Sequence, residues 1–500
     1  MGPIRVLSTS VAWLPWGAAA FARARAERRP VLLSLTASWC QWCREMDRTS
    51  YADPAIATLI NERFVPVRVD ADERPDISER YSLGGWPTTA FLNADGAILG
   101  GGTFLPIERM PGVLAEVLSV CDAQSDLAAA PPPRAHASPS RASHTSLAEI
   151  ISGVFATFDR QHGGVGGEPK FPHVAPLRLA LDLWSETRDP QYERILITSL
   201  DAMGWGGVYD EVDGGFFRYA AARDWQLPHT EKLLDVNASL IRLYLDAGAA
   251  LGITRFTERG ADVLRYVQTW LADPVDGGWF GSQQADDDYY AARAPDARRR
   301  LPAPAVTRLQ FTDSNAAMVS AALHAAEVFE DEGLRAFALT SLERVLLGTY
   351  KPGAGVAHFS DGQPRVRGLL VDQAAMAAAS LDAHEVTGNV VYEMMAEELA
   401  SYAIRLMWDD EQDGFFDCAD EGESAIGLMR QRLKPFAVNC DFARTLRRLA
   451  GSSGESSFAE RAEWILHAMA PLALEQGPLA AHYVLAVRDP VGPVIDSRRA

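Results

Sequence analysis

The chain has 500 residues, of which 48% are hydrophobic and 23% are charged. This is the composition of a globular protein, and no stretch approaches the roughly 18–20 unbroken apolar residues that a membrane span needs. The formal net charge of −19 disfavours nucleic acid phosphates and anionic membranes as partners. Five cysteines are few and odd in number, which argues against a secreted disulfide scaffold and favours a reducing, cytoplasmic location.

Residues 1–121 alternate between helix and strand patterns, which predicts an α/β domain. The apolar stretch near the start is interrupted by Pro15, Trp16 and Gly17, so we expect a helix there rather than a signal peptide. In chain order, the pattern predicts a helix over 18–27, a strand over 31–36, a helix over 44–60, a strand over 64–70, a hairpin over 88–92 and 97–99, and a helix over 106–121.

Residues 122–146 contain a proline run and few large apolar residues, which predicts a linker. Residues 147–500 have long helical patterns separated by a recurring glycine-aromatic turn. The turns lie at 162–166 (without the aromatic), 213–217, 276–280 and 413–416, with a degenerate copy at 351–355. Spacings of about 50–60 residues fit pairs of helices. Six such hairpins can close into an (α/α)6 toroid with the turns on one rim.

A Cys-x-x-C motif stands between the first predicted strand and the helix after it. The helix N-terminus favours the Cys40 thiolate as the attacking sulfur, and Cys43, one turn later, can resolve a mixed disulfide. Pro87, which precedes the next strand, is the candidate cis proline beside the pair. The tryptophans Trp39 and Trp86 flank these positions and are candidate contacts for a thiol or disulfide partner.

Two other interpretations of the motif remain open: half of a zinc site, or a redox-silent pair of thiols. A structural zinc site would need two further ligands. The remaining cysteines form no second Cys-x-x-C, so we expect neither a metal nor another cofactor; they are Cys121, Cys418 and Cys440.

The helical part retains few lysines, since the whole chain has 4 Lys and 43 Arg. Pro228 is predicted to begin a helix that places His229 and Lys232 on one face and Glu231 on an adjacent face. We expect His229, Glu231 and Asp210 to form an acid/base group near the rim. Residues of the types that bind sugars surround them, because carboxylates accept hydrogen bonds from hydroxyls and rings stack on sugar faces. The candidates for this role are Lys170, Arg218, Tyr219, Trp225, Lys232, Trp279 and Asp286. In the alternative interpretation, the aromatics pack the hairpin ends and the acids cap helices.

The chain resembles the spermatogenesis-associated thioredoxin-like proteins, also called YyaL-type thioredoxin-domain proteins, over nearly its whole length. The N-terminal marks are residues 13–17, 29–34, 69–76 and 85–89; those of the helical part are 169–172, 206–210, 214–219, 228–232, 237–238, 285–286, 315 and 372. The resemblance implies a thioredoxin-like domain fused to a six-hairpin toroid similar to those of sugar epimerases and glycosidases. It adds Phe171 and Asn237 to the candidate ligand-binding residues.

The chain departs from the family pattern at several positions. Gln41 and Arg44 stand where family members usually carry histidine, so we expect no neighbouring imidazole to activate the thiol. Asp235 with Val236 displaces the family aspartate by one position, and Gln284 and Ser314 replace other expected residues. These departures predict that the toroid either takes a different ligand from typical members or lacks catalytic activity.

Three hypotheses follow. The first is a thiol-disulfide oxidoreductase module attached to a toroid that binds a carbohydrate-like ligand. The second makes the toroid a sugar isomerase, epimerase or glycoside-processing enzyme. The third is a non-enzymatic adaptor that grips a client protein.

Overall fold

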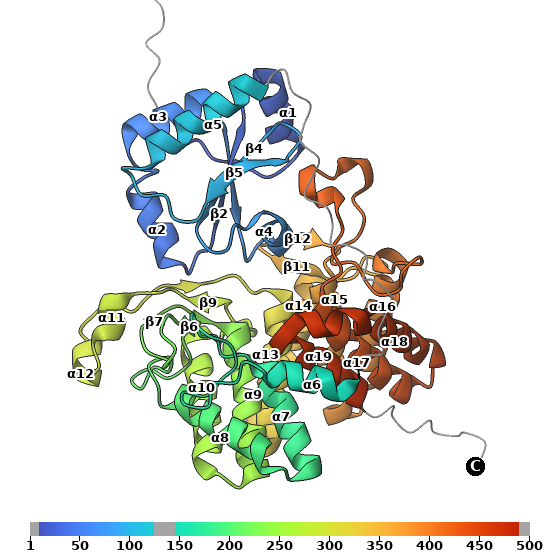
Figure 1. Cartoon of the computed structure of the whole chain (residues 1–500). Helices are drawn as coiled ribbons and strands as arrows, with labels where there is room; N and C mark the ends of the chain where they lie inside the picture. The colour runs from blue at the N-terminus through green and yellow to red at the C-terminus, as the bar shows by residue number, and fades with distance from the viewer. Residues whose placement is uncertain (1–9, 125–145, 490–500) are drawn as a thin grey trace, which may run out of the picture. The chain divides into compact units, whose positions relative to one another are not determined.

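The computed structural model describes residues 10–124 and 146–489, which form two compact units (Figure 1). Unit 1 combines residues 10–124 with the distant segment Asp420–Arg432, and unit 2 contains the other described residues. The sequence analysis placed 420–432 in the helical domain, whereas its contacts lie in unit 1. Most of the predicted linker, residues 125–145, lies outside the described residues; residues 122–124 continue the last helix of the first 124 residues.

A five-stranded sheet forms the centre of unit 1, in the order β1-β3-β2-β4-β5. The strands are β1 Leu14–Pro15, β2 Val31–Thr36, β3 Val65–Asp70, β4 Thr88–Leu92 and β5 Ile98–Gly102. β2 pairs in parallel with β3 and antiparallel with β4, with Leu33 opposite Val67 and Ala90. Since side chains alternate between the two faces of a strand, β2 supplies apolar residues to cores on both sides of the sheet.

Five helices cover the two faces of this sheet: α1 Ala18–Glu27, α2 Gln41–Arg48, α3 Pro54–Arg63, α4 Pro75–Tyr81 and α5 Met110–Gln124. One core joins the sheet to α1 and α4, and the other joins it to α2, α3 and α5. The predicted helix over 44–60 was wrong in its extent. The chain breaks between α2 and α3 because Asp53 caps a new helix, accepting hydrogen bonds from the backbone N–H groups of Ala55 and Ile56, and Pro54 begins it.

The segment Asp420–Arg432 packs on the α4 side of unit 1. The Tyr81 hydroxyl accepts a 2.8 Å hydrogen bond from the Leu428 N–H and donates one of 2.8 Å to the Gly96 carbonyl. Gly427, with φ 56°, approaches so closely that a Cβ there would lie 2.3 Å from the Tyr81 hydroxyl oxygen. The segment contains the short 3₁₀ helices η2 Gly422–Ser424 and η3 Gly427–Arg430.

Within the described residues of unit 2, six helices form a closed ring in which each packs on the next and the last returns to the first. In ring order they are α7 Val174–Thr187, α9 Leu234–Leu251, α13 Thr312–Phe329, α15 Leu370–Thr387, α17 Phe436–Ser453 and α19 Ala480–Arg488. Their outer partners are α8 Pro190–Gly204, α10 Thr254–Tyr266, α14 Glu332–Thr349, α16 Val390–Met407, α18 Ser456–Met469 and, from the start of the unit, α6 Leu147–Phe155. This arrangement is the (α/α)6 toroid that the sequence predicts.

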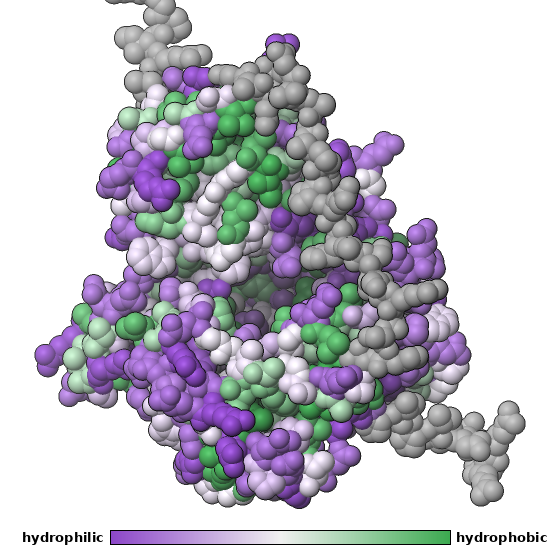
Figure 2. Space-filling model, in the orientation of Figure 1, coloured by the Kyte–Doolittle hydropathy of each residue, from purple (hydrophilic) through white to green (hydrophobic). Residues whose placement is uncertain are grey.

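Short strands and helices connect these pairs near the N-terminal ends of the inner helices (Figure 1). The strands are β6 Tyr219–Ala220, β7 Pro228–His229, β8 Lys232–Leu233, β9 Ser282–Gln283, β10 Val306–Thr307, β11 Ala357–Ser360 and β12 Pro364–Arg367. The helices are the π-helix η1 Val267–Leu271, α11 Asp287–Ala291, α12 Pro295–Arg298 and the 3₁₀ segment η4 Ala470–Leu479. In the view of Figure 2, hydrophilic residues predominate over α11 and α12. Among the described residues, no helix has both the length and the apolar composition that crossing a membrane requires.

Candidate functional site

The Cys40–Cys43 pair lies where β2 leads into α2. Cys40 is the N-cap of α2, and its Sγ accepts a 3.3 Å hydrogen bond from the Cys43 N–H. Neither is in a disulfide, and the two residues have 5% and 3% of their surface exposed. The hydrogen bond to Cys40, together with burial, raises the pKa of the Cys43 thiol. The arrangement therefore holds the proton on Cys43 and directs the helix N-terminus at the Cys40 sulfur.

The surroundings of the dithiol are aromatic and ordered by hydrogen bonds. The Trp39 indole N–H donates to Asp72 Oδ2 at 2.7 Å, and the Trp39 ring packs edge-to-face on the Trp86 ring with centroids 5.8 Å apart. The peptide bond between Trp86 and Pro87 is cis, as the sequence predicts. Trp42, inside the motif, leaves 47% of its surface exposed. An exposed ring beside a buried sulfur pair is an apolar surface on which a partner can rest.

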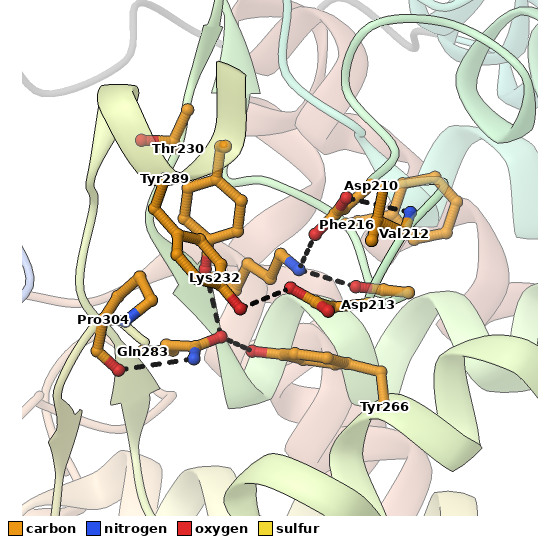
Figure 3. Close-up of polar contacts among 12 residues, drawn as sticks. Asp210, Val212, Asp213, Phe216, Thr230, Lys232, Tyr266, Gln283, Tyr289 and Pro304 are labelled. Carbon is orange, nitrogen blue, oxygen red and sulfur yellow. Dashed lines mark hydrogen bonds and ion pairs between the residues drawn. The ribbon is translucent and has the colours of Figure 1, made fainter. Parts of the chain in front are cut away.

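In unit 2, lysines hold three of the glycine turns. Lys232 Nζ donates a 2.8 Å hydrogen bond to Asp210 Oδ2 and a 2.6 Å hydrogen bond to the Gly214 carbonyl (Figure 3). It thereby connects the two ends of the turn. Lys434 makes the equivalent pair of contacts with Asp409 and the Asp413 carbonyl. At the first turn, Lys170 binds Asp159 at 2.7 Å. A compact ammonium with three donors suits such a site, which explains why these lysines persist in an arginine-rich chain.

Asp210 is fully engaged by this framework. Besides Lys232, it accepts from Arg298 Nη1, which lies 2.7 Å from each carboxylate oxygen. Arg298 also reaches Asp213, whose Oδ2 accepts a 3.0 Å hydrogen bond from the Tyr289 hydroxyl. Burial acts to raise the pKa of Asp210, but the two cations more than offset burial, and the pKa is lowered from 3.8. A carboxylate held in this way is poorly placed to exchange protons with a ligand.

Side-chain amides hold the aromatic residues that follow the glycines. Asn237 Oδ1 accepts from the Phe216 N–H at 2.7 Å, and its Nδ2 donates to the Phe216 carbonyl at 3.1 Å. Asn439 pairs with Phe415 in the same way at 2.7 and 2.9 Å. The same pairing joins Asn315 to Trp279 and Gln373 to Val356. Each inner helix with such an amide is thereby fastened to the turn before it.

Most of the sequence-predicted toroid residues belong to this framework. Those with no more than 2% of their surface exposed are Lys170, Asp210, Trp225, Lys232, Asn237 and Trp279. Trp225 also donates its indole N–H to the His162 carbonyl at 2.8 Å. Asp286 caps α11 by accepting from the Tyr289 N–H. The structure thus favours the alternative interpretation for these residues, in which they pack the hairpin ends and cap helices.

The expected helix from Pro228 is absent. Residues Pro228–His229 and Lys232–Leu233 are the strands β7 and β8, and the helix begins only at Leu234, because both segments pair with neighbouring strands. His229 and Lys232 therefore do not share a helical face.

The rim retains one aromatic stack from the predicted set. The His229 ring stacks on Tyr219 with centroids 4.2 Å apart, and Tyr219 stacks on Phe171 at 4.6 Å. Burial lowers the pKa of His229. Arg218 Nη1 pairs with Glu231 Oε1 at 3.2 Å. These side chains lie close together, as predicted, but Asp210 belongs to the separate buried network.

The sequence analysis did not identify an acidic group that gathers at the N-terminal ends of three inner helices. We call it the mouth cluster: Asp235 of α9, Asp313 of α13, Asp372 of α15 and His358 of β11. His358 Nδ1 lies 2.9 Å from Asp372 Oδ1. Burial, followed by the charge of a neighbouring aspartate, raises the pKa of Asp235; burial likewise raises the pKa of Asp313. A signal was available, since Asp235 and Asp313 each stand two residues before a clamping asparagine.

A cavity of about 380 Å³ lies at the centre of the ring, and all six inner helices contribute to its lining. Its charged side chains are mostly paired: Arg448 with Asp382 at 2.6 Å, and His482 with Asp441 at 2.9 Å. Arg242 lies 3.9 Å from Asp382 and keeps 44% of its side chain exposed. Further polar lining comes from Arg178, Ser239, Ser320, Arg444, Thr445 and Asp489. This polar space can accommodate a ligand with many hydroxyl groups.

A family model and several curated proteins are similar in sequence to this chain. Residues 4–127 match the family model Thioredox_DsbH, described as "Protein of unknown function, DUF255". Spermatogenesis-associated protein 20 of Rattus norvegicus is 30% identical over 315 residues, which cover 55% of this chain and 39% of that protein. The chain spans about two fifths of the length of these curated relatives.

Solved structures resemble the toroid. A D-mannose isomerase superposes with a TM-score of 0.51 at 13% identity, covering 64% of this chain and 83% of that one. A cellobiose 2-epimerase from Bacillus thermoamylovorans superposes with a TM-score of 0.51 at 11% identity, covering 64% of this chain and 86% of the other. At such low identities these likenesses show a common fold.

Proposed function

We propose that Cys40 and Cys43 carry out thiol-disulfide exchange in the thioredoxin-like domain, which is fused to an (α/α)6 toroid. Residues 4–127 match the family model Thioredox_DsbH, and the chain is similar to spermatogenesis-associated protein 20. The observation that supports this most directly is the position of Cys40. Its sulfur caps α2 and accepts the Cys43 N–H, whereas Cys43 keeps its proton because its pKa is raised. Cys40 is therefore the attacking sulfur and Cys43 the resolving one.

The exchange runs in two balanced steps. The Cys40 thiolate attacks one sulfur of a partner disulfide, the partner S–S bond breaks, and the released thiolate takes up a proton. Cys43 then gives up its proton and attacks Cys40 Sγ, which forms the Cys40–Cys43 disulfide and frees the second partner thiol. Two electrons pass from the dithiol to the partner disulfide.

The test is the reaction of the reduced full chain with 5,5′-dithiobis(2-nitrobenzoate), followed by mass spectrometry. Cys43→Ser should accumulate a mixed disulfide on Cys40, and Cys40→Ser should lose the fast phase of the reaction. Cys121→Ser, which changes a thiol outside the motif, is the matched control and should react like the unaltered chain. Equal rates for Cys40→Ser and the unaltered chain would contradict the proposal.

We propose as a second function that the central cavity of the toroid binds a neutral polyhydroxylated ligand such as a sugar. The cavity is large enough for a small sugar, and its lining combines guanidinium, carboxylate, imidazole and hydroxyl groups, each of which hydrogen-bonds to sugar hydroxyls. The fold that it shares with sugar isomerases and epimerases supports a ligand of this class.

Calorimetric titration of the full chain with mannose and cellobiose tests this function. Arg242→Met removes a donor that lines the cavity and should weaken sugar binding at least tenfold. Arg265→Met changes an arginine that is 69% exposed on the outer helix α10 and is the matched control. Absence of binding heat across a broad panel of sugars would count against the proposal and would leave the dithiol function untouched.

A further inference from the structure

Asp372 is a buried carboxylate of unit 2 with an oxygen left unsatisfied in the described part of the chain. It is fully buried in the first turn of α15, and its Oδ2 has no hydrogen-bond partner among the described residues. Its other oxygen lies 2.9 Å from His358 Nδ1, and His358 is itself only 2% exposed. A buried carboxylate oxygen without a donor is costly unless another positive group approaches it.

Asp313 completes a set of three potential ligands. Asp313, His358 and Asp372 each offer one ligand atom, and these three atoms lie within 4.8 Å of one another. Two ligand atoms on opposite sides of an octahedral ion, each about 2.2 Å from it, are about 4.4 Å apart, and adjacent ones are about 3.1 Å apart. The most widely separated pair of this set would have to approach by at least a few tenths of an ångström to bind one ion. The three residues come from three separate elements, which fix them independently.

We propose that Asp313, His358 and Asp372 bind a divalent metal ion at the mouth of the toroid. Two carboxylates and a neutral imidazole carry two negative charges, which a divalent ion balances. Oxygen and nitrogen ligands without thiolate suit Mn²⁺, Fe²⁺ or Zn²⁺. The ion occupies the side on which Asp372 Oδ2 lacks a donor.

Two features of the site argue against a bound metal ion: the positive helix N-termini and the possible protonation of His358. The N-termini of α13 and α15 carry partial positive charge, which stabilises the aspartates and repels a cation, but each amounts to only about half a charge. A protonated His358 could also pair with Asp372. That pair leaves Asp372 Oδ2 unsatisfied and puts nothing between Asp372 and Asp313, whose charges repel.

The experiment uses the full chain with Cys40→Ser and Cys43→Ser, so that the dithiol binds no metal, after dialysis against EDTA. Binding of Mn²⁺ is followed by loss of the electron paramagnetic resonance signal of the free ion, and Zn²⁺ by its competition with Mn²⁺. We expect one Mn²⁺ per chain, displaced by Zn²⁺ as the order of metal affinities requires. Asp313→Asn and Asp372→Asn should each weaken binding at least tenfold.

Asp441→Asn is the matched control, because it removes an aspartate from another histidine-aspartate pair and should leave Mn²⁺ binding unchanged. Circular dichroism establishes that each variant folds. If Asp372→Asn does not fold, the less buried Asp313→Asn decides the outcome. The proposal is overturned if Mn²⁺ does not bind the chain, or if it binds the Asp313→Asn variant as tightly as it binds the chain with Asp313 intact.

Discussion

Two buried aspartates of the toroid differ in how many of their carboxylate oxygens have hydrogen-bond or ion-pair partners. Asp210 is held by Lys232 and Arg298, and both of its oxygens accept hydrogen bonds. Asp372 is equally buried, but one of its oxygens contacts His358 and the other has no donor among the described residues. Burial and residue type do not separate the two. What separates a framework carboxylate from one that could take a ligand here is whether its hydrogen bonds are satisfied.

The largest effect is expected where the satisfied network is broken. Asp210→Asn leaves the buried cation Lys232 without its carboxylate partner and Arg298 with Asp213 as its remaining one, so the free energy of unfolding should fall by about 3–5 kcal/mol. Urea unfolding followed by circular dichroism measures this. A second variant that adds Lys232→Met removes the orphaned charge and should recover part of the loss; no recovery would mean that the ion pair is not the cause.

The same network should make the toroid acid-sensitive. The pKa of Asp210 is lowered in the folded state, so its contribution to stability is present above the ordinary value of 3.8 and is lost as the pH falls through the folded-state pKa. Unfolding midpoints between pH 5 and 2 should decline less steeply in Asp210→Asn than in the unaltered chain. Parallel curves would contradict this prediction.

A smaller loss is expected at the amide clamps, which carry no charge. Asn439→Ala leaves the Phe415 N–H and carbonyl without partners, so the free energy of unfolding should fall by about 1–3 kcal/mol. Gln412→Ala changes an exposed amide in the preceding turn and should alter stability by less than about 0.5 kcal/mol. Equal effects of the two substitutions would show that the clamp adds nothing.

The fold was more predictable from the sequence than the site. Alternating strands with Cys40 at a strand-helix junction predicted the thioredoxin-like unit, and the period of the glycine turns predicted six hairpins. These signals are local or repetitive, so they survive without knowledge of contacts. The position of residues 420–432 was not predictable, because it depends on Tyr81 and Gly427 meeting across more than 340 residues of chain.

The role of the toroid residues was harder to predict for a related reason. Lys232 stood out because the chain has only 4 lysines, and Asn237 came from the family resemblance, but similar lysine and amide contacts recur at several of the hairpins as clamps. Asp313 and His358 drew no attention, since their meeting depends on the closure of the ring. Comparing the repeats with one another would have separated the clamps from the mouth cluster.

In unit 1, the effect of removing satisfied hydrogen bonds can be tested at an uncharged side chain, where we expect a smaller loss of stability. Tyr81→Phe removes the hydroxyl that joins the Gly96 carbonyl to the Leu428 N–H, which should cost about 1 kcal/mol and loosen the segment Asp420–Arg432. Hydrogen exchange at the Leu428 amide should become faster. Tyr51→Phe, which removes a hydroxyl bonded to Thr89 in the same unit, is the control and should leave that amide unchanged. Protection at Leu428 that survives Tyr81→Phe would contradict the assigned contact.

The smallest effect on stability is expected at the mouth cluster. Asp235 has an exposed side chain, but it lies within the mouth of the ring, where the desolvation by surrounding protein and the charge of Asp313 raise its pKa. Asp235→Asn should therefore change the free energy of unfolding by less than about 0.5 kcal/mol, because no buried cation loses a partner. Urea unfolding in parallel with Asp210→Asn makes the comparison direct, since the same substitution is made at two aspartates of one unit. A loss at Asp235 as large as that at Asp210 would mean that the mouth cluster is framework too, and that hydrogen-bond satisfaction does not separate the two regions.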